Sequence, residues 1–372
     1  MKFLHTSDIH IGAKFEMLGE KAPKQREQIK RTFSNVVDLA IKEKVDLVLL
    51  AGDLFDSNHP SQKNIEFVKN EFSRLNEEDI KVCLIPGNHD FKLSDASGLG
   101  GEFFDIPGVY LFVDPEGGKG YFDDINTEVF AKANISNKSS ESPIINADSD
   151  RDSFKIVMAH GGVVGQAKDP EYPIQPSEIE NCGAYYVALG DWHSLRNESR
   201  GDVKAFYSGS PEMISISQSG SGYVLMGEVT GDRSVDVRKV KVGERETETL
   251  NIDAGELSSV DELKEKIKEH ASGNRVLIVG IGGINSNKLI FSTDELEEEL
   301  QDDFWRLRIR DKSTPPLEDL NEDDYPAMLI SGQFLQLMKD KIGNAENEEE
   351  RKLHEEALQL GLLSFQDPDV IQ

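Results

Sequence analysis

Side chains able to bind metal ions recur directly after short apolar runs in the first half of the sequence. They form five groups: Asp8-Ile9-His10, Gly52-Asp53-Leu54-Phe55-Asp56, Gly87-Asn88-His89-Asp90, His160-Gly161 and Gly190-Asp191-Trp192-His193. Taken singly, each group is more often a turn or a helix cap than a functional site. Together they indicate one converging site, because binding crevices form at the carboxyl ends of strands in α/β sheets.

The residue types suit divalent metal ions. Carboxylate, amide oxygen and imidazole ligands fit Mn²⁺, Fe²⁺, Mg²⁺ or Zn²⁺, whereas the absence of thiolates argues against a structural zinc site. Asp8 and His10 are two residues apart on an extended segment, so both side chains can point the same way, and Asp191 and His193 repeat this spacing. Two ions roughly 3.5–4 Å apart need a bridging carboxylate. Asp53 is the candidate for that role.

The elements expected to position these groups alternate between strands and helices. Apolar residues at helical spacing predict helices over 25–43 and 61–75, and apolar runs predict strands over 2–7, 45–51 and 81–86. This order favours a largely parallel sheet with helices on its faces. Further strands are expected at 108–113, 128–133, 155–160, 185–189, 204–208 and 222–228.

The second part of the chain has a different pattern. Residues 231–310 are expected to form a separate unit of strands and two helices, at 261–271 and 293–301. An alternating strand at 305–310 places Arg306, Arg308 and Arg310 on one face, either as a phosphate-contacting strip or as a solvated surface. Residues 311–326, with a proline pair and an acidic cluster, are typical of a linker. Two helices with apolar stripes are expected at about 327–342 and 347–363.

Composition narrows the class of protein. The chain has 372 residues and a net charge of −28, which lowers the expectation of a nucleic-acid partner without excluding one. No apolar run approaches the roughly 18–20 residues that a membrane span needs, and the N-terminus lacks the apolar core of a signal peptide. We therefore expect a cytoplasmic protein with no membrane partner. Cys83 and Cys182 show no metal-binding spacing and are expected to be buried free thiols.

The five groups resemble the motifs of the calcineurin-like metallophosphoesterase superfamily. Within it, the segments LHTSDIHIG, AGDLFDSNHPS, PGNHD and YSGSPE resemble the DNA-repair exonuclease branch, the SbcD-type nuclease subunits. The resemblance is strong over roughly residues 1–230 and only architectural beyond that. It implies an α/β fold, a four-layer α/β/β/α sandwich with a small α+β capping domain and C-terminal helices. It also implies two metal ions per chain, usually Mn²⁺, and cleavage of phosphodiester bonds in DNA.

The resemblance also implies roles for individual residues. One ion would be held by Asp8, His10, Asp53 and His193, and the other by Asp53, Asn88, His160 and Asp191. Water activated by the two ions would attack the phosphorus in line. His89 is similar to the family histidine that contacts phosphate and assists the leaving oxygen. Asp90 would orient the His89 imidazole.

Some positions depart from the family pattern or stay open. Asp191 stands where many relatives have histidine, which adds negative charge and leaves the metal preference undecided. Asp56 stands where some relatives place a histidine near the scissile phosphate. His59 precedes Pro60 and is open to a substrate contact or a loop role. Ser208, in a Ser-Gly-Ser-Pro turn, is open to a substrate contact or a purely structural role.

The resemblance implies a domain order and partners. Residues 1–230 would be the nuclease domain, 231–310 the capping domain, 311–326 a linker and 327–372 a helical segment that binds partners. In SbcD-type proteins such a segment docks on an SbcC-like coiled-coil ATPase, and a homodimer is also open. Packing of the two helices on this chain's own capping domain is the alternative to a partner contact.

Three classes of function follow. The first is a DNA exonuclease or endonuclease acting with an ATPase in DNA repair and recombination. The second is a phosphatase or cyclic-nucleotide phosphodiesterase of the same superfamily. The third is a non-catalytic scaffold that keeps the fold. The 140 or so residues after the core favour the first class, since a compact phosphatase needs neither a cap nor a partner arm. Candidates at every ligand position argue against the third.

Overall fold

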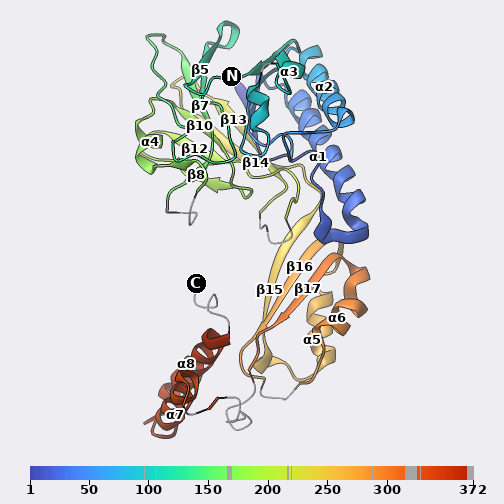
Figure 1. Ribbon diagram of the computed structural model, residues 1–372, viewed down its shortest axis with the longest axis vertical. Helices are drawn as coiled ribbons and strands as arrows, with labels where there is room; N and C mark the ends of the chain where they lie inside the picture. The colour runs from blue at the N-terminus through green and yellow to red at the C-terminus, as the bar shows by residue number, and fades with distance from the viewer. Residues whose placement is uncertain are drawn as a thin grey trace. The chain divides into compact units, whose positions relative to one another are not determined.

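The computed structural model divides the chain into two compact units, Met1–Thr247 and Glu248–Gln372 (Figure 1). It describes residues 1–95, 97–104, 106–165, 170–215, 218, 220–285, 289–314, 325–326 and 328–366.

The first sheet of unit one has the strand order β14-β13-β1-β2-β3-β4. Strands β1 to β4 run parallel to one another, whereas β13 pairs antiparallel with β1 and β14 pairs antiparallel with β13. Their bounds are β1 (Lys2–Thr6), β2 (Leu47–Ala51), β3 (Lys81–Ile85), β4 (Val109–Leu111), β13 (Tyr223–Val229) and β14 (Val235–Lys241). The parallel strands place three of the five predicted ligand groups at one edge of the sheet.

The second sheet of unit one has the order β11-β12-β10-β7-β6-β5. Its central strands β6, β7, β10 and β12 are parallel. The bounds are β5 (Gly118–Phe122), β6 (Thr127–Ala131), β7 (Phe154–His160), β10 (Tyr186–Gly190), β11 (Arg196–Asn197) and β12 (Lys204–Tyr207). A separate small pair, β8 (Gly162–Val163) and β9 (Pro173–Ile174), follows β7.

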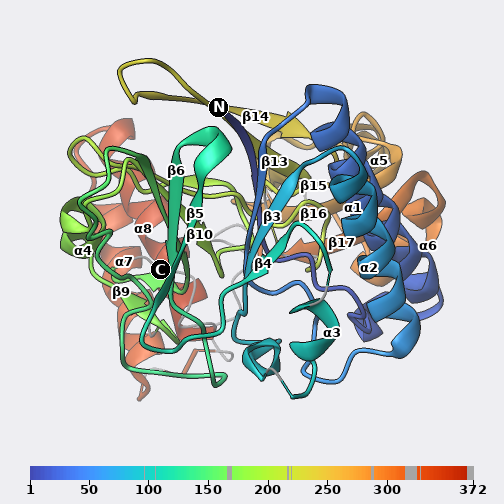
Figure 2. The same cartoon turned by 90° about the horizontal axis from the view of Figure 1, so that it is seen from above.

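The helices of unit one lie on the outer faces of the two sheets (Figure 2). On the first sheet they are α1 (Ala22–Glu43) and α2 (Gln62–Glu77), with α3 (Gly101–Phe104) nearby, and on the second sheet α4 (Pro176–Asn181). Helix α1 buries Ile29, Phe33 and Val37 along one face, as their spacing predicts. Helix α2 begins where the Ser61 side chain accepts a hydrogen bond from the N–H of Asn64. Short 3₁₀ turns are η1 (Glu16–Lys21), η2 (Phe91–Ser94) and η3 (Asp123–Ile125).

The main core of unit one lies between the two sheets. Apolar side chains of β1, β2 and β3, such as Phe3 and Leu49, pack there against Ile156, Tyr186 and Ala188 from the second sheet. A second core joins the outer face of the second sheet to α4 through Ile179. Helix, sheet, sheet and helix layers follow in that order, which confirms the predicted four-layer α/β/β/α sandwich. Cys83 and Cys182 are buried free thiols, as expected.

Unit two contains a three-stranded sheet in the order β15-β16-β17. Its strands are β15 (Glu246–Asp253), β16 (Ser272–Gly282) and β17 (Phe304–Asp311), with α5 (Val260–Lys268), α6 (Thr293–Leu300) and the 3₁₀ turns η4 (Ala254–Glu256) and η5 (Gln301–Asp303). One face of the sheet packs on α5 and α6 through a common apolar core. Helices α7 (Ile330–Gly343) and α8 (Glu348–Gln366) pack against each other through a separate apolar cluster.

The predicted domain boundary at residue 230 differs from the break at Thr247 and Glu248. Strand β14 lies beyond residue 230 yet hydrogen-bonds along its length to β13, which keeps it in the first unit. The predicted linker at 311–326 overlaps the end of β17, and most of it, residues 315–324, lies outside the described residues. Within the described part of the chain, no helix has both the length and the apolar character required to cross a membrane.

Candidate metal centre

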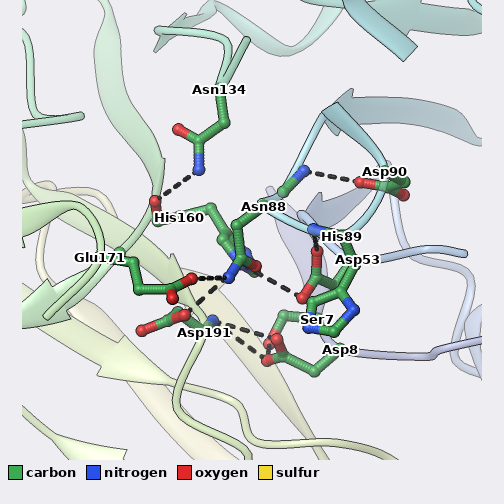
Figure 3. Close-up of polar contacts among 12 residues, drawn as sticks. Ser7, Asp8, Asp53, Asn88, His89, Asp90, Asn134, His160, Glu171 and Asp191 are labelled. Carbon is green, nitrogen blue, oxygen red and sulfur yellow. Dashed lines mark hydrogen bonds and ion pairs between the residues drawn. The ribbon is translucent and has the colours of Figure 1, made fainter. Parts of the chain in front are cut away.

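The predicted ligand groups converge where the carboxyl ends of the two sheets meet (Figure 3). Asp8, Asp53 and Asn88 follow β1, β2 and β3 of the first sheet. His160 ends β7 and pairs in register with Gly190 on β10, so Asp191 leaves its strand beside it. The two sheets therefore contribute donors to one site from opposite sides.

Glycine is required where the two sheets approach each other. A Cβ atom on Gly190 would lie 1.9 Å from the backbone oxygen of Ala51, and one on Gly52 would lie 2.2 Å from His160 Nδ1. Gly52 also has a φ of +90°, which residues other than glycine rarely adopt. The close approach lets His160 Nδ1 donate a hydrogen bond to the Ala51 carbonyl oxygen at 2.9 Å. That bond leaves His160 Nε2 directed into the site.

The first group of candidate ligands consists of Asp8, His10 and His193, whose donor atoms lie within 4.8 Å of one another. His10 Nδ1 lies 3.2 Å from a carboxylate oxygen of Asp56, which holds the ring with Nε2 towards the cluster. His10 Nε2 lies 3.5 Å from Asp53 Oδ2. Asp53 thereby joins the set predicted for the first ion.

The second group forms around His160. Its Nε2 lies 3.4 Å from Asp53 Oδ2, 3.1 Å from Asn88 Oδ1 and 3.9 Å from Asp191 Oδ1. The same Asp53 oxygen thus lies between the imidazoles of His10 and His160. This placement suits a carboxylate shared by two ions. All seven predicted ligands are brought together, four in each set with Asp53 in common.

The residues present fit divalent ions. The Nε2 atom of His10 is buried and, among the described residues, has no hydrogen-bond partner. A buried polar atom without a partner is costly, and a bound cation would satisfy it. The donor set of carboxylate, amide and imidazole groups matches divalent transition metals or Mg²⁺.

Without a cation, the carboxylates of the cluster favour the protonated form of two imidazoles. Burial opposes charge on His10, yet its contact with Asp56 and the charges of Asp53 and Asp8 raise the pKa of His10. Burial likewise opposes charge on His160, and the charge of Asp53 raises the pKa of His160 well above its usual value. A bound cation would displace these protons, so metal binding should release protons.

In two other candidate ligands, the effect of burial on the pKa outweighs that of the neighbouring charges. Burial raises the pKa of Asp191 to about 6, although the charge of His160 acts in the opposite direction. Burial also lowers the pKa of His193 to about 4, against the nearby charge of Asp8. His193 therefore presents a neutral imidazole with a free lone pair over the ordinary pH range, as a metal ligand must.

Four of the seven candidate ligands have an unusual backbone conformation. Asp8, His10 and Asp53 have φ values of 54°, 52° and 52°, and Asp191 has a φ of 100°. Residues other than glycine rarely adopt these φ values, which cost of order 1–3 kcal/mol for each residue. Residues strained in this way cluster at functional sites. The strain turns the backbone sharply after each strand and directs the side chain into the site.

The prediction for Asp90 is wrong in this structure. Its buried carboxylate accepts hydrogen bonds from the N–H groups of Phe55 at 3.0 Å and Gly87 at 2.7 Å, so it joins two ligand-bearing turns. The exposed His89 ring instead has its Nδ1 atom 3.3 Å from the backbone oxygen of Asp56. The His89 N–H donates to Asp53 Oδ1 at 3.0 Å. His89 also lies within 4.8 Å of His10 and Asp53 as a possible ligand group.

The predicted substrate residues have four different surroundings. Asp56 orients His10 rather than standing free for substrate. Ser208 is 1% exposed and hydrogen-bonds to Ser7 at 2.9 Å, which favours the structural alternative over a substrate contact. His59 is exposed beside Lys92, with 3.4 Å between His59 Nε2 and Lys92 Nζ. The three arginines belong to β17 in unit two, where Arg308 pairs with Glu297 at 3.3 Å.

Three supporting residues were missed by the sequence reasoning. Ser7 donates a hydrogen bond to Asp8. Asn134 is buried and donates to the backbone oxygen of His160 at 3.0 Å. Glu171 accepts from Asn88 Nδ2 at 2.7 Å and so turns the amide oxygen of Asn88 towards the site (Figure 3). Ser7 adjoins a ligand in sequence and could have been suspected, whereas Asn134 and Glu171 come from loops that give no such signal.

Comparison with known proteins agrees with this geometry. A family model described as calcineurin-like phosphoesterase matches residues 1–195, and the chain belongs to this family, whose members bind divalent metals and hydrolyse phosphate esters. It is 29% identical over 366 residues to the metallophosphoesterase YhaO of Bacillus subtilis, covering 87% of this chain and 85% of that protein.

Two further relatives are archaeal. The DNA double-strand break repair protein Mre11 of Methanococcus maripaludis is 28% identical over 262 residues, covering 65% of this chain and 67% of that protein. The protein of the same name from Methanocaldococcus jannaschii is 26% identical over 271 residues, covering 68% and 69%.

Proposed function

We propose that the chain is a two-metal nuclease that hydrolyses phosphodiester bonds in DNA, with Mn²⁺ as its metal, and that it works as the nuclease subunit of a DNA repair complex. The observation that carries the proposal is the convergence of seven donor side chains, with one Asp53 oxygen between two imidazoles. The two archaeal relatives, named as DNA double-strand break repair proteins, favour DNA as the substrate.

The residues around the cluster have definable roles in this reaction. When bound, two divalent ions would lower the pKa of a water molecule and neutralise charge on the phosphoryl oxygens. Asp56 and the Ala51 carbonyl fix the ring orientations of His10 and His160. His89 is exposed at the rim of the cluster, where it can contact the phosphate and protonate the leaving oxygen.

We also propose that unit two is a capping domain and that it contacts DNA through β17. Arg310 is exposed and Arg306 is half-buried, whereas Arg308 is already paired with Glu297. Of the three arginines, Arg308 therefore has the least charge to offer a phosphate. We assign the contact to Arg306 and Arg310.

The association with a coiled-coil ATPase is supported by apolar side chains on the α7–α8 hairpin. Leu335, Met338 and Ile342 are buried within the hairpin itself. Leu337 and Leu353 stay 54% and 62% exposed, and Ile330 is 76% exposed. Exposed apolar groups gathered on one element are typical of a protein contact.

The test compares substrates and removes the shared carboxylate. The full chain loaded with Mn²⁺ is incubated with labelled single- and double-stranded DNA, with bis(p-nitrophenyl) phosphate and with p-nitrophenyl phosphate. We expect cleavage of DNA and of the diester, loss of both activities with EDTA, and loss of both in Asp53→Ala. A matched control is Asp46→Ala, at an acidic residue in the loop before β2, which should keep its activity.

Two results would contradict the proposal in different ways. Hydrolysis confined to the monoester would favour the phosphatase alternative. Full activity of Asp53→Ala with bound metal would remove Asp53 from the centre and with it the two-metal assignment.

A further inference from the structure

A cleft of about 690 Å³ opens beside the candidate metal centre. The cleft is lined by Asp56, which orients His10, and by His89 at the rim of the ligand cluster. Its lining also includes Asn58, His59, Phe91 and Lys92. Its volume lies within the usual range of ligand sites, about 300–1,000 Å³. A group bound to the scissile phosphate on the His89 side would therefore enter this cleft.

Lys92 contributes a positive charge to the lining of the cleft. The N–H group of Lys92 donates a hydrogen bond to Asn58 Oδ1 at 2.7 Å, which ties the loop after β3 to the loop after β2. The Lys92 ammonium then lies 3.4 Å from His59 Nε2. Asp95, on the same turn, is exposed, and its carboxylate accepts hydrogen bonds from the N–H and the hydroxyl group of Ser97 at 3.0 Å and 2.7 Å. The ammonium itself remains exposed to solvent.

The acidic groups of the cleft are engaged elsewhere. Asp56 faces His10 Nδ1 at 3.2 Å. Glu171 accepts from Asn88 and lies 3.2 Å from the ammonium of Lys138. Both carboxylates thus serve the metal end of the cleft, and the Lys92 end is left to attract anions. Phe91, half-buried on the same wall, adds an aromatic surface suited to a base.

We propose that this cleft is a subsite for the nucleotide next to the scissile phosphate, in which Lys92 binds the phosphate of that neighbouring nucleotide. This inference rests on the proposed nuclease function and specifies its substrate as a chain of nucleotides. A single-phosphate diester reaches His89 and the metals but offers nothing to Lys92. The enzyme should therefore use Lys92 to prefer polynucleotides over isolated phosphodiesters.

The experiment compares two substrates at several salt concentrations. Steady-state kinetics of the full chain with Mn²⁺ are measured on a single-stranded oligonucleotide and on bis(p-nitrophenyl) phosphate. Lys92→Ala should raise KM for the oligonucleotide about tenfold, the loss expected for one charged hydrogen bond. The slope of log KM against log salt concentration should fall by about 0.7, the value for one phosphate contact on a single strand. KM and kcat for the single diester should not change.

Two further variants separate charge from packing. Lys92→Arg keeps the charge and should restore the oligonucleotide KM and its salt slope. Lys119→Ala, at an exposed lysine on edge strand β5, should leave both values as in the wild type.

The outcomes that overturn the subsite are distinct from those that overturn the function. Equal losses of Lys92→Ala on both substrates, or no loss on either, would show that Lys92 binds no second phosphate. A wild-type enzyme that hydrolyses the single diester and leaves the oligonucleotide intact would refute the nuclease function itself, before any variant is made.

Discussion

Replacement of His89 by alanine separates metal binding from chemistry. The His89 ring is exposed, and its contacts are the backbone oxygen of Asp56 and the edge of the His10 ring, with 4.8 Å between ring centroids. The hydrogen bond to Asp53 comes from the His89 backbone N–H, which alanine retains. We therefore expect His89→Ala to keep Asp53 in place and to change the free energy of unfolding by less than about 0.5 kcal/mol.

The expected loss is in rate. One positioned acid or electrostatic group contributes about 100-fold or more, which corresponds to about 2.7 kcal/mol of transition-state stabilisation. The loss should be larger for DNA, whose leaving alkoxide needs a proton, than for bis(p-nitrophenyl) phosphate, whose phenolate leaves without one. The assay measures kcat on both substrates at saturating Mn²⁺, together with calorimetric metal stoichiometry. His354→Ala, on α8, is the matched control.

Three results would refute this reasoning. Loss of bound metal in His89→Ala would make His89 a ligand, as its distance from His10 and Asp53 allows. Equal losses on the two substrates would leave a phosphate contact but remove the proton transfer. A change below about tenfold on DNA would remove His89 from the reaction.

Further predictions concern one ligand, one core residue and the last helices. Asp191→Asn should weaken one of two metal sites in a calorimetric titration, and Asp191→His should restore that site with a different metal preference; unchanged titrations would place Asp191 outside the ligand set. Burial, opposed by the contact with Leu189, lowers the pKa of His5 to about 3, so its neutral form is favoured in the folded state. The stability that neutral His5 contributes is fully present at pH values above the ordinary histidine pKa, and it decreases by about 2 kcal/mol as the pH is lowered from 7 to 5. In chemical unfolding of the metal-free protein, the wild type should therefore lose about 2 kcal/mol more stability over this pH range than His5→Gln. Equal losses in the two proteins would contradict the burial argument. Deletion of residues 327–372 should leave a folded chain that cleaves a small diester but no longer binds the ATPase; aggregation or loss of the thermal transition would return these helices to the enzyme's own core.

Much of the fold could be predicted because its elements have strong periodic patterns. Ile29, Phe33 and Val36 mark α1, and the unbroken apolar run at 47–51 marks β2. The edge strands β5, β11 and β14 were not predicted individually. Strand β5 contains two glycines and reads as a turn, and β14 has mostly exposed side chains that alternate too weakly to indicate a strand. Edge strands are paired on one side only, so their sequences are less constrained.

The site could be predicted as a set of residues but not as a set of contacts. The candidate metal ligands come directly after strands, and the order of the strands in the sheets brings them together regardless of the loop conformations. Asp90 shows the limit of that argument, because its side chain turns inward to two backbone N–H groups and away from its neighbour His89. Glu171 shows another, since its contact with Asn88 depends on the path of a loop 83 positions away.

Because the candidate ligands are divided between two sheets, the thickness of the core between these sheets affects the activity of the site. Asp53 comes from one sheet and His160 from the other, and the core between the sheets, with Phe3 and Tyr186 among its residues, sets their separation. Protein interiors are close-packed and compress little, while a displacement of about 1 Å in a catalytic site can cost about 100-fold in rate. Substitutions in this core can therefore lower activity before they unfold the protein, at residues that never contact metal or substrate.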